Sequence, residues 1–218
     1  MKKFISRPRE PFSGLSHWLG VALAVIGFVA LIVMSWGKPV HLVAFAIYGV
    51  TLVLLYAASA IYHSSNASED VVAKWQKFDY VAIYLLIAGT YVPVCLLALH
   101  GAVGWGLLVA QTILATSGVL ATLLMKKVPS VVRVLLYLVM GWMAVAAMGQ
   151  MQSSWPPYAV AWLVAGGIVY SVGAVVYALD RPHLWPGKFS AHDLWHIFVL
   201  GGSACHFILM VTYVVRIA

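Results

Sequence analysis

Two histidines near the end of the chain, His192 and His196, have the spacing with the clearest chemical meaning. Residues four positions apart on an α-helix share one face, about one turn from each other, so both imidazoles can reach a single ion. His63, at the end of another apolar segment, is the best third ligand. Three imidazoles with an open position for water are typical of catalytic zinc sites, whereas four protein ligands close a structural site. We therefore predict a Zn²⁺ site formed by His63, His192 and His196.

Two further polar residues could supply the remaining chemistry of a hydrolytic site. Asp79 could hydrogen-bond a metal-bound water and accept its proton. Ser59, one helical turn before His63, could orient that water. The alternative for Asp79 is a carboxylate at the start of an apolar segment, where it stabilises the helix N-terminus with Lys77 nearby. Beside the histidines we favour the functional interpretation, and we predict Asp79 and Ser59 as catalytic residues.

Histidines within a membrane protein also have a purely structural use, because they can hydrogen-bond neighbouring helices. Three histidines at one depth beside a carboxylate favour a metal site.

His206 lies about 15 Å further along the helix than His196, so it cannot share that ion. We expect it to hydrogen-bond between helices or to line a cavity. Asp193 is predicted to be an acid that stabilises the first helical turn. For Glu10, capping and catalytic roles both stay open.

The composition decides which kind of element must position these residues. Of the 218 residues, 63% are hydrophobic and only 9% are charged, whereas soluble domains carry about 25% charged residues. This excludes a soluble enzyme, a disordered chain and a disulfide scaffold. The cations lie in short gaps between apolar runs rather than in a basic stripe, which excludes a nucleic-acid-binding protein.

A helix needs about 20 mostly apolar residues to cross the hydrocarbon core of a membrane. The first apolar run is longer than that of a signal peptide and lacks a cleavage site, so we predict a span there. We predict an all-α, polytopic membrane protein with seven transmembrane helices in one domain over residues 1–218. The predicted spans are 15–36, 40–62, 80–99, 104–125, 131–150, 158–179 and 192–215.

Lysine and arginine predict the orientation, because they are enriched in cytoplasmic loops. Eleven of the thirteen cations fall on one side of this topology and two on the other. The N-terminus is therefore predicted to be cytoplasmic and the C-terminus outside, with the candidate ligands and catalytic residues in the cytoplasmic half. The eleven are Lys2, Lys3, Arg7, Arg9, Lys74, Lys77, Lys126, Lys127, Arg133, Arg181 and Lys188, and the two are Lys38 and Arg216.

Four stretches of the chain carry a resemblance to a known family. They are Glu10 to Gly20 (EPFSGLSHWLG), Ser59 to His63 (SAIYH), Asp79 to Pro93 (DYVAIYLLIAGTYVP) and His192 to His206 (HDLWHIFVLGGSACH). In these stretches and their order, the sequence resembles the bacterial hemolysin III family, the prokaryotic branch of the progestin and adipoQ receptor superfamily. The resemblance extends over all seven predicted spans.

The resemblance implies a seven-helix fold with the N-terminus inside. In the similar adiponectin receptors, the residues matching His63, His192 and His196 bind zinc, and those matching Asp79 and Ser59 lie beside it. Those receptors are linked to ceramide hydrolysis, and the superfamily is grouped with membrane-bound alkaline ceramidases. The family name itself comes from haemolysis reported for a relative.

Three functions are left open by these observations. The first is a ceramidase-like, zinc-dependent hydrolase of a lipid amide or ester, in the bacterial inner (plasma) membrane. The second is a non-enzymatic regulator of membrane homeostasis, or a sensor, with structural zinc. The third is a membrane-lytic, haemolytic protein. The sequence fixes neither the substrate nor the oligomeric state.

Overall fold

The computed structural model describes residues 10–182, 184–185 and 189–217. Within these ranges, seven helices are long and apolar enough to cross a membrane, and no β-strand is formed. The predicted all-α protein with seven spans is thus confirmed. Of the cations used to predict the orientation, Lys2, Lys3, Arg7, Arg9 and Lys188 lie outside the described residues, and the cytoplasmic placement of the N-terminus stays a prediction.

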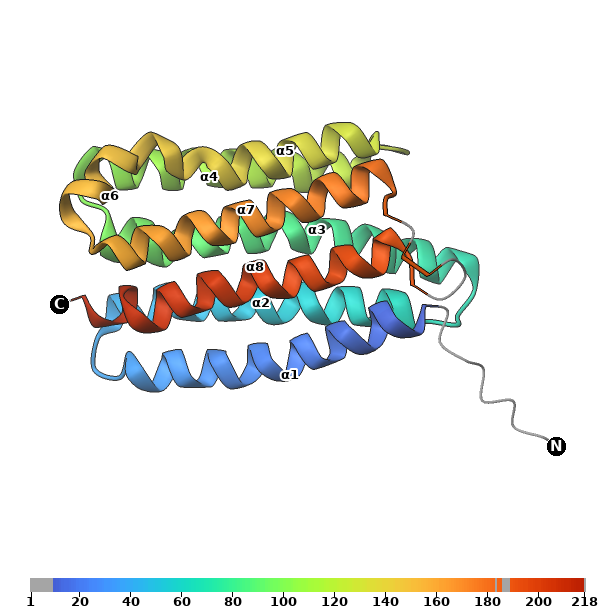
Figure 1. Cartoon of the computed structure of the whole chain (residues 1–218), viewed down its shortest axis with the longest axis horizontal. Coiled ribbons are helices and arrows are strands. Elements are labelled where there is room, and N and C mark those ends of the chain that lie inside the picture. The colour runs from blue at the N-terminus through green and yellow to red at the C-terminus, as the bar shows by residue number, and fades with distance from the viewer. Residues whose placement is uncertain (1–9, 183, 186–188, 218) are drawn as a thin grey trace.

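The helices follow one another with short connections (Figure 1). Three of them begin with proline at the first or second helical position, where its missing N–H has no intrahelical partner to lose. The elements are α1 (Pro11–Met34), α2 (Pro39–Ser64), α3 (Glu69–Pro93), α4 (Gly101–Leu124), α5 (Ser130–Trp142), α6 (Met148–Ser154), α7 (Pro157–Leu179) and α8 (Ala191–Thr212). The fifth span consists of α5, a 3₁₀ turn (Met143–Ala147) and α6.

The seven spans form a closed ring of neighbours. Each span packs against the next along the chain, and α8 also contacts α1, which closes the ring. Because the number of spans is odd, the start of α1 and the end of α8 lie at opposite ends of the bundle (Figure 1). The end of α2, the start of α3 and the start of α8 lie at the same end as the start of α1.

The third span begins much earlier than the sequence predicted. Its α-helix starts at Glu69 rather than at residue 80, because the polar turn before the apolar run is also helical. Glu69 and Asp70 are the acids of its first turn, where they complement the helix dipole. Asp79 is therefore an interior residue of α3, and the alternative interpretation of Asp79 as a helix-start carboxylate is wrong.

The interruption of the fifth span is held by a side chain from α3. The Tyr91 hydroxyl donates to the Gly141 carbonyl at 2.8 Å and accepts from the Ala144 amide at 2.8 Å. These bonds satisfy backbone groups that the change from α-helix to 3₁₀ turn would leave unpaired in an apolar environment. The broken segment forms part of the wall of an internal cavity.

Candidate metal centre

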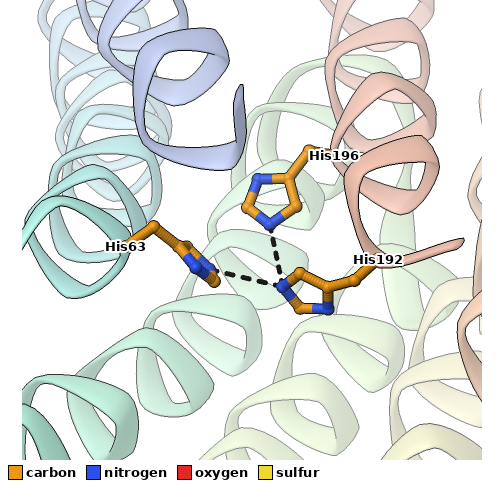
Figure 2. A group of neighbouring side chains, drawn as sticks. All are labelled: His63, His192 and His196. Atoms are coloured by element: carbon orange, nitrogen blue, oxygen red, sulfur yellow. Dashed lines mark hydrogen bonds between the residues drawn. The ribbon is translucent and has the colours of Figure 1, made fainter. Parts of the chain in front are cut away.

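Three histidines converge at the end of the bundle where α1 begins. His63 lies in the last turn of α2, and His192 and His196 lie in the first two turns of α8. Figure 2 shows the three imidazole rings pointing toward one another from these two helices. His63, the predicted third ligand, thus lies on another helix next to His192 and His196.

Two of the distances between the ring nitrogens are close to those around one metal ion. His192 Nε2 is 3.2 Å from His196 Nε2 and 3.5 Å from His63 Nε2, and one ligand atom of each ring lies within 4.8 Å of the others. Zinc–nitrogen bonds of 2.0–2.1 Å at tetrahedral angles separate two ligand nitrogens by about 3.3–3.4 Å. The three side chains could therefore hold one ion with little movement.

Hydrogen bonds between the rings alone do not explain this arrangement. His63 Nδ1 lies 2.5 Å from Glu10 Oε2. A carboxylate only accepts, so this contact assigns the proton to Nδ1 and the lone pair to His63 Nε2. A single proton on His192 Nε2 can point either to His63 Nε2 or to His196 Nε2, but not to both. A metal ion would accept the lone pairs of all three Nε2 atoms, and a set of three imidazoles suits zinc, copper, iron or nickel.

Glu10 is the residue of this site that the sequence did not assign. It is the N-cap residue of α1, directly before Pro11, and its backbone N–H donates to the His63 carbonyl at 3.2 Å. Gly14 permits the close approach of α1 to the end of α2, because an added Cβ would lie 2.6 Å from Ser64 Oγ. A proline such as Pro11 is typical of a helix start, which here lies at the same end of the bundle as the histidines. Sequence spacing alone could not pair Glu10 with His63.

The two predicted catalytic residues lie on the helices that flank the histidines. Ser59 is buried one turn before His63 on α2, and Asp79 lies on α3. Asp79 has Ser59, His63 and Arg133 among its electrostatic neighbours. Both side chains line the cavity that also contacts His192 and His196. A carboxylate and a hydroxyl thus face the space next to the candidate ligands.

Asp193 stabilises the start of α8, as predicted. Its carboxylate accepts from the Ser190 backbone N–H at 2.9 Å, while its own backbone N–H donates to Ser190 Oγ at 3.1 Å, which completes a capping box. Its other oxygen accepts from Ser13 Oγ of α1 at 2.7 Å. Both oxygens are therefore used to hold α8 at the site rather than to bind an ion.

Replacing Asp193 with Ala should destabilise the protein without removing the metal site. Loss of the hydrogen bonds that the Asp193 carboxylate accepts costs about 1 kcal/mol, which lowers the melting temperature by roughly 2–4 °C in a protein of this size. Thermal unfolding in detergent measures the change. The matched control is Asp70→Ala, because Asp70 is an exposed first-turn acid of α3, whose N-cap Ser68 forms no side-chain cap hydrogen bond. Loss of bound metal from the Asp193 variant would contradict this structural role.

Two other histidines lie close to this centre or to its cavity. The His17 ring packs behind His196, with ring centroids 4.0 Å apart, and is buried. His206 Nε2 donates to the Leu163 carbonyl of α7 at 3.3 Å, which confirms the predicted interhelical hydrogen bond. Neither belongs to the group of histidines that could hold the ion.

The cavity that His192 and His196 line has a volume of about 760 Å³. Glu10 and Phe189 line one end of it, and Leu163, Met148 and His206 line the part that extends toward the middle of the bundle. Most of the wall between them is apolar, and its polar residues include Ser59, Asp79 and a buried Arg133. The Arg133 guanidinium lies 3.5 Å from the centre of the Tyr80 ring. Two of the three candidate ligands, His192 and His196, thus border a space suited to an apolar chain.

Comparisons with known proteins agree with this architecture. The sequence model of a family described as "Haemolysin-III related" matches residues 5–207. Hemolysin-3 of Bacillus cereus is 34% identical over 220 residues, with 100% of this chain and 96% of that protein covered. The Hemolysin-3 homolog of Bacillus subtilis (strain 168) is 35% identical, with 95% of each chain covered. The human monocyte to macrophage differentiation factor is 25% identical over 92% of this chain and 82% of its own length.

Fold and site together define a seven-helix integral membrane protein with a three-histidine centre at one end of its bundle. Its family is shown by the sequence model that matches residues 5–207 and by the two relatives from Bacillus. The chain belongs to the haemolysin-III-related family, with more distant relatives similar to adiponectin receptors.

Proposed function

We propose that this protein is a zinc-dependent hydrolase of a membrane lipid amide or ester, with zinc bound by His63, His192 and His196. The observation that carries the proposal is the convergence of three imidazoles beside a mostly apolar cavity. His192 Nε2 lies from each of the other two Nε2 atoms at a distance close to that between ligands of a tetrahedral ion. Three protein ligands leave a fourth position free for water, as in catalytic zinc sites. The site would face the cytoplasm of a bacterial inner membrane.

The residues around the centre have distinct roles in this proposal. When bound, zinc supplies a Lewis acid that activates water and polarises a scissile carbonyl. Asp79 accepts the proton of the attacking water and returns it to the leaving group. Ser59, its neighbour on α2, orients that water. Glu10 holds His63 in the tautomer whose Nε2 lone pair faces the centre.

The cavity supports a lipid as the substrate class. Its apolar wall can take a hydrocarbon chain, while the polar groups of the substrate stay at the end near Glu10 and Arg133. Arg133 is a buried cation that stacks on the Tyr80 ring and has Asp79 as an electrostatic neighbour. Because a buried cation is costly inside a membrane protein, its place in the cavity wall favours a substrate with a polar or anionic head.

The test is hydrolysis by purified protein in vesicles that contain single lipid species, among them ceramide and glycerol esters. We expect turnover of at least one amide or ester, its loss after zinc is removed by a chelator, and its recovery when zinc is returned. Full activity of the metal-free protein would reject the proposal, as would zinc-loaded protein that hydrolyses none of the lipids.

Replacing Glu10 with Ala is expected to weaken zinc binding by about 10- to 100-fold, because partners that orient metal ligands contribute this much. The zinc affinity of Glu10→Gln should lie between those of the wild type and the Ala variant, since the Gln amide oxygen can still accept from His63 Nδ1. Competition with a chelator of known affinity measures the change. Glu69→Gln is the control, because Glu69 is an exposed first-turn acid of α3, and this variant should bind zinc as the wild type does. Unchanged affinity in Glu10→Ala would contradict the role of Glu10.

A further inference from the structure

The wall of the cavity contains a second polar position far from the metal centre. His206 lies on α8, ten residues after His196, which corresponds to about 15 Å along a helix. Both side chains line the same cavity. The lining of that cavity is mostly apolar and includes Val145, Met148 and Leu163.

The orientation of the His206 ring is fixed by α7. Its Nε2 lies 3.3 Å from the Leu163 carbonyl oxygen. A carbonyl oxygen only accepts, so Nε2 carries the proton and Nδ1 of the neutral ring carries a lone pair. Gly166 provides the room for the ring, because a Cβ at that position would overlap the imidazole. The Tyr170 ring packs on it with centroids 5.6 Å apart.

No donor from the described residues reaches His206 Nδ1. The nearby hydroxyl groups are used elsewhere, because Ser203 Oγ bonds the Tyr56 hydroxyl at 2.8 Å and the Tyr170 hydroxyl at 2.7 Å. The His206 side chain is nevertheless partly exposed, and it lines the cavity. A lone pair in a mostly apolar wall is costly unless a donor from the cavity satisfies it.

We propose that His206 Nδ1 accepts a hydrogen bond from a hydroxyl group carried on the apolar chain of the bound lipid. The substrate class would then be a hydroxylated amphiphile, with its head at the metal centre and a chain hydroxyl about 15 Å away. This inference rests on the proposed function, because it needs a lipid chain in the cavity. It does not depend on whether that lipid is hydrolysed.

The test is equilibrium binding of three fatty acids of equal length to the wild-type protein in lipid nanodiscs. One is unsubstituted, one has a hydroxyl in the distal half of its chain, and one has a hydroxyl next to the carboxylate. A single neutral hydrogen bond predicts about five-fold tighter binding of the distally hydroxylated acid. The acid with the hydroxyl near the carboxylate should show no such gain, because that hydroxyl would lie far from His206.

Two variants test the assignment to His206. His206→Leu should still bind the unsubstituted acid and should lose the preference for the distal hydroxyl. His206→Gln should retain part of it, because its amide can donate to the Leu163 carbonyl and accept from the ligand. The wild-type comparison does not depend on either variant folding.

The outcomes separate this inference from the proposed function. Equal binding of all three acids by a protein that hydrolyses lipid would overturn the inference alone. Binding of none of them would overturn the inference and also the proposed lipid cavity. A preference that persists in His206→Leu would overturn the assignment to His206.

Discussion

Replacing Asp79 with Asn should lower lipid hydrolysis by at least about 100-fold, because the amide cannot accept the proton of the attacking water. Zinc should stay bound, since Asp79 is not one of the three histidine ligands. Initial rates and zinc content of the same preparation give both quantities. Asp70→Asn is the matched control, because Asp70 is an exposed acid on the same helix and lies away from the cavity.

The same variant separates the hydrolase from a non-enzymatic membrane factor. A regulator or sensor with structural zinc needs the metal but not a proton acceptor. Asp79→Asn should then complement a deletion strain as well as the wild-type gene does. Full complementation by a variant that retains zinc would contradict the hydrolase, whereas its failure would weaken the regulator hypothesis.

A lytic protein should instead lyse erythrocytes when added in purified form.

Replacing His196 with Ala should abolish the stabilisation of the fold by zinc. An ion present at 1,000 times its dissociation constant stabilises the native state by about 4 kcal/mol, which corresponds to roughly 8–16 °C in melting temperature for a protein of this size. The wild type should lose this increment on chelation and regain it with zinc, whereas the variant should respond to neither.

The control for this experiment is His100→Ala. His100 is exposed and precedes α4 at the other end of the bundle, so its variant should respond to zinc as the wild type does. If His196→Ala does not fold, His192→Ala serves the same purpose, because His192 is partly exposed. A full zinc response in either ligand variant would contradict the three-histidine site.

The spans could be predicted from sequence because the membrane imposes one strong requirement. Every helix that crosses it needs a long apolar run, and these runs are separated by breakers such as Gly37 and Pro39. The boundaries were less predictable, since a helix can extend beyond the apolar run. Residues 69–79 show this, because their polar side chains did not indicate that they continue α3.

The candidate ligands could be predicted because two constraints act together. The helical period places His192 and His196 on one face, and the topology places His63 at the same depth. The pairing of Glu10 with His63 could not be predicted, because it depends on how closely α1 packs against the end of α2. The cavity and the position of His206 in its wall likewise depend on packing between helices distant in sequence.

Elemental analysis of freshly purified protein is the most direct test of a zinc centre at His63, His192 and His196. The wild type, prepared without added metal, should contain close to one zinc per chain. The variant with all three histidines replaced by Ala should contain almost none. A wild type without zinc, or a triple variant that retains a full equivalent, would contradict the proposed centre.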